Sequence, residues 1–173
     1  MPGESDVPDD VWLSSAQKRD WASLVALLMA LPTRLDAHLK QVAGINFYEY
    51  SVLVSLAEAP ERTRVMSDLA VQARGSLSRL SHAVTRLETA GWVRRRSCGG
   101  AGRRTEVVLV EAGWQELQRI APHHVDEVRR LVVDAIEPRE FEQLGSAARH
   151  ILACVDPLAA TTLESAIGRL PRT

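Results

Sequence analysis

The sequence predicts a mainly α-helical protein in which two helices joined by a tight turn precede a pair of short β-strands, with long helices on either side. The stretches "WVRRRS" and "TEVVLV" are rich in Trp and Val, which favour strands, and the Gly-rich segment "CGGAGRR" between them suits a hairpin turn. A hydrophobic content of 46% with 25% charged residues is typical of a globular chain. We therefore expect one domain over residues 1–173.

A long helix is expected near the N-terminus, after an acidic, Pro-rich arm at residues 1–13. Ser14 and Gln17 have the spacing of a capping box, which predicts where the helix starts. Gly44 suits the C′ position at its end, and Pro32 predicts a break or kink. The middle of this helix, "LVALLMAL", is apolar nearly all round, so one side must face something beyond its own domain's core.

A second capping-box pattern, Asn46 with Glu49, predicts another helix, which Pro60 ends. A short helix, "MSDLAVQA", follows, and a longer one, "SLSRLSHAVTRLETAG", ends at Gly91. Arg74-Gly75 is the expected turn between them.

The longer helix of this pair is amphipathic. Its apolar stripe consists of Leu77, Leu80, Val84 and Leu87. Its opposite face carries Ser78, Arg79, His82, Thr85 and Arg86. A tight Gly-containing turn before a helix with a basic outer face is the pattern of a helix-turn-helix, whose second helix reads the major groove of DNA. The strand pair that follows then forms the wing of a winged helix-turn-helix, over residues 46–113.

Charge is distributed unevenly along the chain. From Arg74 to Arg104 there are eight arginines and one acid, Glu88, so this segment carries +7, whereas the whole chain carries −1 and the remainder −8. A solvated charged face usually interleaves both signs, so a segment of one sign predicts a phosphate-binding surface. We expect the helix to read base edges and the hairpin arginines to contact the backbone and the minor groove. The predicted DNA-binding residues are Arg74, Ser76, Ser78, Arg79, His82, Arg86, Arg94, Arg96, Arg103 and Arg104.

Helices are also expected after the wing, with Pro122 kinking the first and Pro138 near the start of the second. Their apolar positions at helical spacing are Leu117, Ile120, Val125, Val128, Leu131 and Val132, then Phe141, Leu144, Ala148, Ile151 and Val155. Residues 14–45 and 114–173 are predicted to be dimerisation helices, because a two-fold dimer reads the two halves of a palindrome. The alternative is one monomeric helical core.

The segments "RVMSDLA", "SLSRLSHAVTRLETAGWVRR", "GRRTEVVLVEAG" and "APHHVDEVRRLVVDAI" resemble the multiple-antibiotic-resistance regulator (MarR) family of bacterial transcription factors, in the form common in actinobacteria. The resemblance covers roughly residues 15–155. The two cysteines make no disulfide framework, so a reducing cytoplasm is the expected location. The resemblance implies a homodimeric repressor of its own or a neighbouring gene. It also implies binding to a palindromic operator in double-stranded DNA, and release by a small phenolic or other anionic ligand.

The chain departs from the family in its wing. The family's Asp-x-Arg element keeps its arginine here as Arg103, but Ala101 stands where the aspartate is expected. Either another acid positions Arg103, or the wing stays mobile until DNA orders it.

The resemblance places a ligand pocket between the dimerisation helices and the winged domain. The aromatic or polar-tipped residues expected to line it are Trp12, Trp21, His38, Tyr48 and Tyr50. For each of them, ordinary packing is the alternative.

Other functions are less well supported. Cys98 lies beside Arg96, so oxidation of this thiol is an alternative switch, whereas Cys154 on an apolar stripe is expected in the core. A winged-helix module that binds proteins is a third possibility. Adjacent His123 and His124 diverge by about 100° on a helix and suit no shared metal. Because no nucleophile, base or phosphate loop emerges, we expect no enzyme and no cofactor. No uninterrupted apolar run approaches the roughly 18 residues of a membrane helix.

Overall fold

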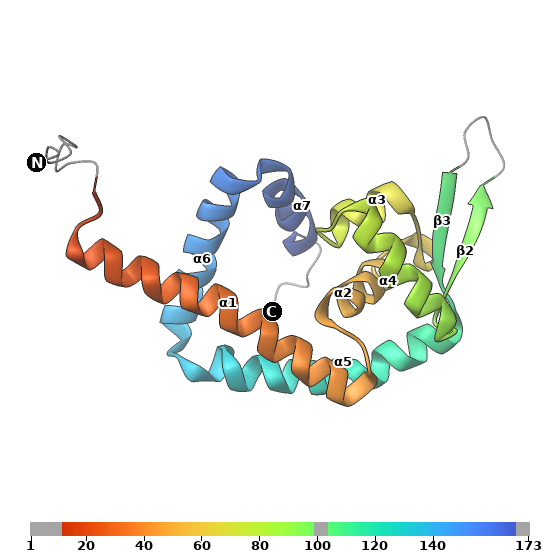
Figure 1. The fold of residues 1–173 in the computed structure, drawn as a ribbon, viewed down its shortest axis with the longest axis horizontal. Coiled ribbons are helices and arrows are strands. Elements are labelled where there is room, and N and C mark those ends of the chain that lie inside the picture. Colours follow the sequence, from red (N-terminus) through yellow and green to blue (C-terminus); the bar gives the residue numbers. More distant parts are fainter. Residues whose placement is uncertain (1–11, 99–103, 169–173) are drawn as a thin grey trace, which may run out of the picture. The chain divides into compact units, whose positions relative to one another are not determined.

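The computed structural model describes residues 12–98 and 104–168, which form helices and one antiparallel sheet (Figure 1). The helices are α1 (Ser15–Ala43), α2 (Phe47–Ala57), α3 (Met66–Gln72), α4 (Leu77–Thr89), α5 (Glu111–Leu131), α6 (Pro138–Val155) and α7 (Pro157–Ile167). The strands are β1 (Thr63–Val65), β2 (Val93–Cys98) and β3 (Arg104–Leu109). Residues up to Arg34 belong to one compact unit and residues from Leu35 to another. This architecture is the predicted winged helix-turn-helix between terminal helices.

Helix α1 begins at the predicted capping box, in which the Ser14 amide donates to Gln17 Oε1 at 2.8 Å and the Gln17 amide donates to Ser14 Oγ at 3.2 Å. It ends at Gly44, whose φ of +70° is the left-handed conformation expected at C′. The break expected near Pro32 is absent, because the helix runs unbroken through that residue. Proline removes one backbone donor, and the flanking turns of a long helix tolerate that loss.

By length and composition alone, α1 is also long and apolar enough to cross a membrane. The sequence did not predict this, because Arg34 and Asp36 interrupt the apolar stretch of the helix. A single such helix is a weak indication of a membrane span, and its last turns bury Leu35 and Leu39 in the core of the second unit.

The sheet has the strand order β1-β3-β2. Strands β2 and β3 pair in the predicted antiparallel hairpin, with Val93 opposite Leu109 and Cys98 opposite Arg104. Strand β1 was not predicted, because three residues carry too little alternation to be recognised. The hairpin tip at residues 99–103, which includes Ala101 and Arg103, lies outside the described residues.

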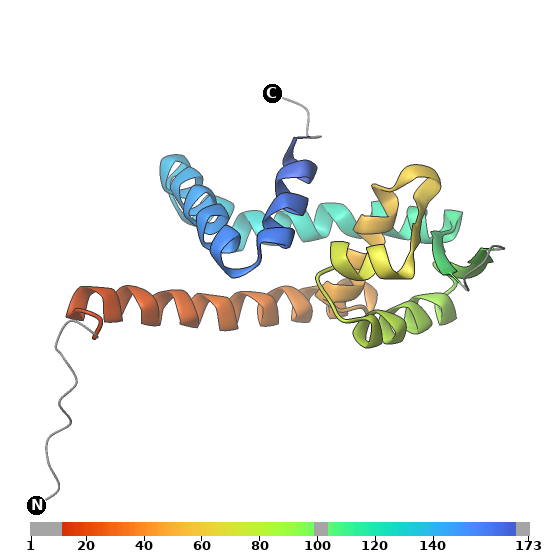
Figure 2. The same cartoon turned by 90° about the horizontal axis from the view of Figure 1, so that it is seen from above.

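Helix α2 is central to the core of the second unit, where it contacts α3, α4, α5, β1 and β3. Figure 2 shows α4 and α5 on opposite sides of α2 and α3. The largest fully buried side chains come from α2, α3, α4, α5 and β3 and include Leu53, Leu56, Leu69, Leu80, Leu87, Val107 and Ile120. Each such side chain contributes about 1.5–3 kcal/mol by leaving water, so burial around α2 is what fixes the position of α4.

The buried face of α4 differs from the predicted stripe at one position. Leu80, Val84 and Leu87 are buried as expected, but Leu77 is 57% exposed. Ala83 is buried in addition, which turns the centre of the buried face by about 30°, to a position about 70° from Leu77 on a helical projection. The first residue of the helix therefore joins the outer face.

Helix α5 begins close to the hairpin because residue 113 is glycine. A Cβ atom at Gly113 would lie 2.1 Å from the backbone oxygen of Trp92, which no side chain tolerates. The helix runs unbroken through Pro122, where a kink was predicted, and buries Leu117 and Ile120. Its second half packs less closely, and Val125 is exposed.

Helices α6 and α7 pack on each other, yet the structure gives neither any buried residue. The apolar positions left exposed include Phe141, Leu144, Ile151, Val155 and Leu158. Cys154 was expected in the core and is instead exposed, on a helix in which no residue is buried.

A small cluster of rings joins α1, α2 and α5. The ring centroid of His124 lies 4.5 Å from that of Tyr50 and 5.8 Å from that of Phe47. His38 Nε2 lies 3.1 Å from the backbone oxygen of His123. Burial, and secondly the nearby His38, lower the pKa of His124, so the folded state favours its neutral form.

This cluster predicts how the free energy of unfolding varies with pH. Because the folded pKa of His124 is lowered, the unfolded chain binds a proton that the folded chain excludes. Stability should be fully present above about pH 6.5 and should fall as the pH drops below it, by up to about 1.4 kcal/mol per pH unit.

Urea unfolding between pH 7 and 5 measures this slope, and His124→Phe should flatten it. Phe47→Leu is the matched control, because it removes packing from the same cluster without removing the titrating group. It should lower stability by a similar amount at each pH. An unchanged slope in His124→Phe would contradict the prediction.

Candidate nucleic-acid interface

The start of α4 is fixed by the turn that precedes it. Arg74 adopts a left-handed φ of 53°, and the Gly75 amide donates to the Ala70 carbonyl at 3.0 Å. Ser76 Oγ then accepts from the amide of Arg79 at 3.2 Å, so Ser76 is the N-cap of the helix. The predicted helix-turn-helix is therefore held by its own backbone and cap.

The outer face of α4 is polar and open to solvent. Its exposed residues include Ser78, Arg79, His82, Thr85 and Arg86, which are those of the predicted polar face. In Figures 1 and 2, α4 and the β2–β3 hairpin lie at the same end of the second unit. The structure thus places a polar helix face and a basic hairpin side by side in one region.

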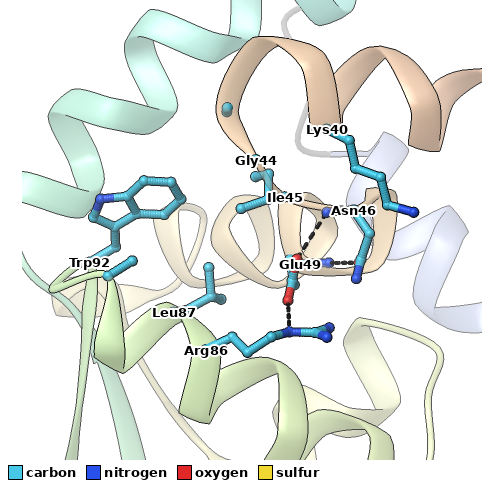
Figure 3. Close-up of a pocket in the computed structure, with 10 residues that line it drawn as sticks. Lys40, Gly44, Ile45, Asn46, Glu49, Arg86, Leu87 and Trp92 are labelled. Carbon is cyan, nitrogen blue, oxygen red and sulfur yellow. Dashed lines mark hydrogen bonds and ion pairs between the residues drawn. The ribbon is translucent and has the colours of Figure 1, made fainter.

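Arg86 is held by a contact that the sequence analysis missed. Its Nε donates to the carboxylate of Glu49, whose side chain is only 5% exposed (Figure 3). The other oxygen of this carboxylate accepts from the Asn46 amide at 2.9 Å, which completes the predicted capping box of α2. The capping pattern explained Glu49 fully, so nothing in the sequence pointed to its second role.

Arg95, which was not among the predicted DNA-binding residues, ties β2 to α4. Its guanidinium bonds to Glu88 Oε2 at 2.6 Å, and to Ser81 O and Thr85 Oγ1 at 2.9 Å each. Its amide donates to Glu88 Oε1 at 2.8 Å. This backbone hydrogen bond, together with the guanidinium, lowers the pKa of Glu88. The base of the hairpin is therefore fastened to the recognition helix.

Arg96 also forms an ion pair within the protein. It lies opposite Glu106 in the β2–β3 register, and its Nε and NH2 donate to Glu106 Oε2 at 3.0 and 2.7 Å. Glu106 lies two residues beyond the segment whose charge was counted, so the count overstated the free positive charge. Arg86, Arg95 and Arg96 are thus ion-paired.

Four arginines of the basic segment make no ion pair among the described residues: Arg74, Arg79, Arg94 and Arg104. All four are exposed. Alternate residues of a strand point to opposite faces, so Arg94 lies on the face of β2 away from the Arg95 contacts to α4. Arg103 lies outside the described residues, and Cys98 is the last residue of β2.

The residues predicted to line a ligand pocket belong to both units, and those of each unit are described separately. In the first unit, Trp12 and Trp21 are 63% and 58% exposed. In the second unit, His38 and Tyr50 belong to the ring cluster, whereas Tyr48 contacts Arg79 of α4. Tyr48 and Tyr50 are about 200° apart on α2, so they cannot face the same side.

A pocket of about 300 Å³ does lie beside α4, and none of the five predicted residues lines it (Figure 3). The residues that line it include Lys40, Ile45, Glu49, Arg86, Leu87 and Trp92. It combines an apolar wall with two cationic groups, and one of these, Arg86, belongs to the recognition helix. The Glu49 carboxylate that pairs with Arg86 also lines the pocket.

No protein-family model and no curated protein sequence matches the chain, but solved structures do. Sco3205, a MarR family transcriptional regulator from Streptomyces coelicolor solved in complex with DNA, is 38% identical to it. The alignment covers 88% of this chain and 94% of that one, with a TM-score of 0.81. AbsC, a MarR family transcriptional regulator from the same organism, is 34% identical over 83% of this chain and 97% of its own, with a TM-score of 0.76.

BldR, a transcriptional regulator from Sulfolobus solfataricus, shares the fold, with 20% identity over 82% of this chain and 99% of its own and a TM-score of 0.69. The two Streptomyces proteins share far more of their sequence with this chain over nearly their whole length. With its helix-turn-helix, its hairpin and these relatives, the chain belongs to the MarR family of transcriptional regulators.

Proposed function

We propose that the protein is a homodimeric, sequence-specific DNA-binding regulator that represses its own or a neighbouring gene and is released by a small anionic molecule. The observation that carries the proposal is the exposed polar face of α4 beside four exposed arginines that have no ion pair among the described residues. Cations without internal partners are available to phosphate. The DNA complex of Sco3205 supports the same assignment.

Within this proposal, the residues divide by position. Arg79 and His82 project from the first turns of α4 and read base edges in the major groove, with Ser78 beside them. Arg74, Arg94 and Arg104 contact backbone phosphate. Arg86 offers phosphate its two terminal nitrogens, because Glu49 holds only its Nε.

Two kinds of substitution should separate base reading from phosphate contact. Arg79→Ala or His82→Ala should cost about 1–3 kcal/mol of binding free energy and relax preference at one base pair per half-site. The four arginines of each protomer assigned to phosphate, Arg74, Arg86, Arg94 and Arg104, neutralise roughly 8 phosphates in a dimer, so log affinity against log salt should slope at about −7. Arg94→Ala with Arg104→Ala should weaken binding to all sequences and bring the slope to about −4.

The test selects DNA fragments with the purified protein and titrates the selected duplex at several salt concentrations. Arg130→Ala is the matched control, because Arg130 pairs with Glu127 on α5, and it should leave affinity and slope unchanged. A wild-type slope shallower than about −3 would show that this basic surface is not the contact. No binding to any fragment, including the gene's own upstream region, would favour a protein-interaction module.

The homodimer rests on the uncovered apolar face of α6 and α7. Neither helix has a buried residue in the single chain, although α6 repeats Phe141, Leu144 and Ile151 at helical spacing. A contiguous exposed apolar face of this kind marks a protein interface. A second copy of the chain fits, because two-fold symmetry presents two recognition helices to two half-sites.

A charge on this face should dissociate the dimer. Leu144→Asp with Ile151→Glu should give a monomer in analytical ultracentrifugation and should lower operator affinity by at least about 100-fold, because burying unpaired carboxylates costs several kcal/mol. The matched control is His150→Glu, which lies about 100–120° from these two residues around α6 and should remain dimeric. A charged double variant that still sediments as a dimer would refute this interface.

Release by a ligand rests on the pocket beside α4. A ring would pack on Ile45, Leu87 and Trp92, while a carboxylate would lie between Lys40 and the terminal nitrogens of Arg86. Since the proposal gives the same nitrogens to a DNA phosphate, ligand and DNA would compete for Arg86. This competition is the physical route to relief of repression.

Benzoate, as a probe anion with an apolar ring, should lower operator affinity, whereas uncharged phenol should not. Lys40→Ala should raise the benzoate concentration needed by about tenfold, the worth of one charge-assisted hydrogen bond, without changing DNA affinity in its absence. Lys18→Ala, which removes a lysine of α1 outside the pocket, is the control. Equal benzoate sensitivity in the two variants would exclude the pocket. If peroxide releases the protein from DNA and Cys98→Ser abolishes that release, the redox alternative is favoured.

A further inference from the structure

Tyr48 of α2 has an unusual environment for a tyrosine. It is 6% exposed, and its hydroxyl oxygen is buried with no hydrogen-bond partner among the described residues. Buried hydroxyl groups nearly always have partners, because an unpaired one costs free energy. Apolar packing alone would be served at least as well by Leu, so the aromatic ring calls for an explanation.

The ring of Tyr48 lies between the Arg74-Gly75 turn and the first helical turn of α4, the recognition helix. The Arg79 guanidinium carbon is 4.1 Å from the ring centroid, the geometry of a cation–π contact. Burial outweighs the opposing effect of Arg79 and raises the pKa of Tyr48, so the phenol stays neutral at physiological pH. The attraction is therefore to the face of the ring and not to a phenolate.

On its hydroxyl side, the ring determines which residue can stand at position 75. A Cβ atom at Gly75 would lie 2.2 Å from the Tyr48 hydroxyl oxygen and 2.6 Å from Cζ. The φ of Gly75 is not in the left-handed region, so the backbone itself would accept alanine. Tyr48 is thus the reason that the turn needs glycine, and the contact brings the ring up to Arg79.

We propose that Tyr48 is a positioning residue that holds the Arg79 guanidinium over its ring and so sets the base preference of the recognition helix. The inference rests on the proposed DNA-binding function. Arg79 is exposed and makes no ion pair among the described residues, so the ring is the contact that limits its rotamers in the free protein. A long side chain ordered before binding loses less conformational entropy on docking.

The test compares Tyr48→Phe with Tyr48→Leu. Phe keeps the aromatic face and removes the unpartnered hydroxyl, so base preference at the Arg79 position should stay within about twofold of wild type. Leu keeps an apolar side chain but removes the face, so the preference should fall about three- to fivefold, the worth of an exposed cation–π contact. In an Arg79→Ala background, Tyr48→Leu should have no further effect on preference.

A measurement without DNA separates this inference from the proposed function. In NMR spectra of the free protein, ring current should move the Arg79 δ-proton signals upfield in wild type and in Tyr48→Phe, and not in Tyr48→Leu. Gly75→Ala should displace the ring and abolish the shift. Should Gly75→Ala fail to fold, Gly75→Ala with Tyr48→Leu relieves the clash and should fold without the shift.

Three results would overturn the inference: no ring-current shift in wild type, equal loss of affinity for every sequence in Tyr48→Leu, or an unchanged preference in Tyr48→Leu while Arg79→Ala relaxes it. If Arg79→Ala itself leaves preference unchanged although the shift is present, the contact exists and the base-reading assignment of Arg79 is wrong.

Discussion

The packing of α4 against α2 is the constraint on which the interface depends. Leu80, Val84 and Leu87 fix the depth of α4 by burial, and the carboxylate of Glu49 fixes its rotation by holding Arg86. Arg86 is itself 64% exposed, so losing this pair should cost about 1–3 kcal/mol, because it leaves the buried carboxylate of Glu49 without its charged partner. Glu49 also caps α2, so the same carboxylate orders the start of one helix and the side chain of the next.

The arginines of the basic segment serve two different purposes. Arg95 and Arg96 are paired with carboxylates and stabilise the fold, and Arg86 gives only its Nε to Glu49. Arg74, Arg79, Arg94 and Arg104 lack such partners among the described residues. A count of charge along the sequence cannot make this distinction, because Glu49 and Glu106 lie outside the counted segment. Net charge locates a surface for phosphate, but the three-dimensional pairing decides which cations are available to it.

The sequence predicted local structure well and tertiary environment poorly. Both capping boxes, the turn at Arg74 and the strand pair depend on residues close in sequence, and all are present. Whether Leu77 and Cys154 are buried depends on which other elements pack against them, and the periodicity of the sequence carries no such information. The pocket beside α4 was missed for the same reason, because its lining comes from α1, α2, α4 and Trp92. The DNA contacts themselves remain predictions.

The attachment of β2 to α4 through Arg95 has a consequence for the DNA. Four hydrogen bonds from one residue make the recognition helix and the base of the wing a single rigid body. In the proposed DNA complex, where these two elements enter neighbouring grooves, the protein sets the distance between them, and the duplex must adjust its own groove width and bend to match it. Base pairs that the protein never touches thereby influence affinity through the stiffness of the double helix, with flexible pyrimidine–purine steps adapting most easily.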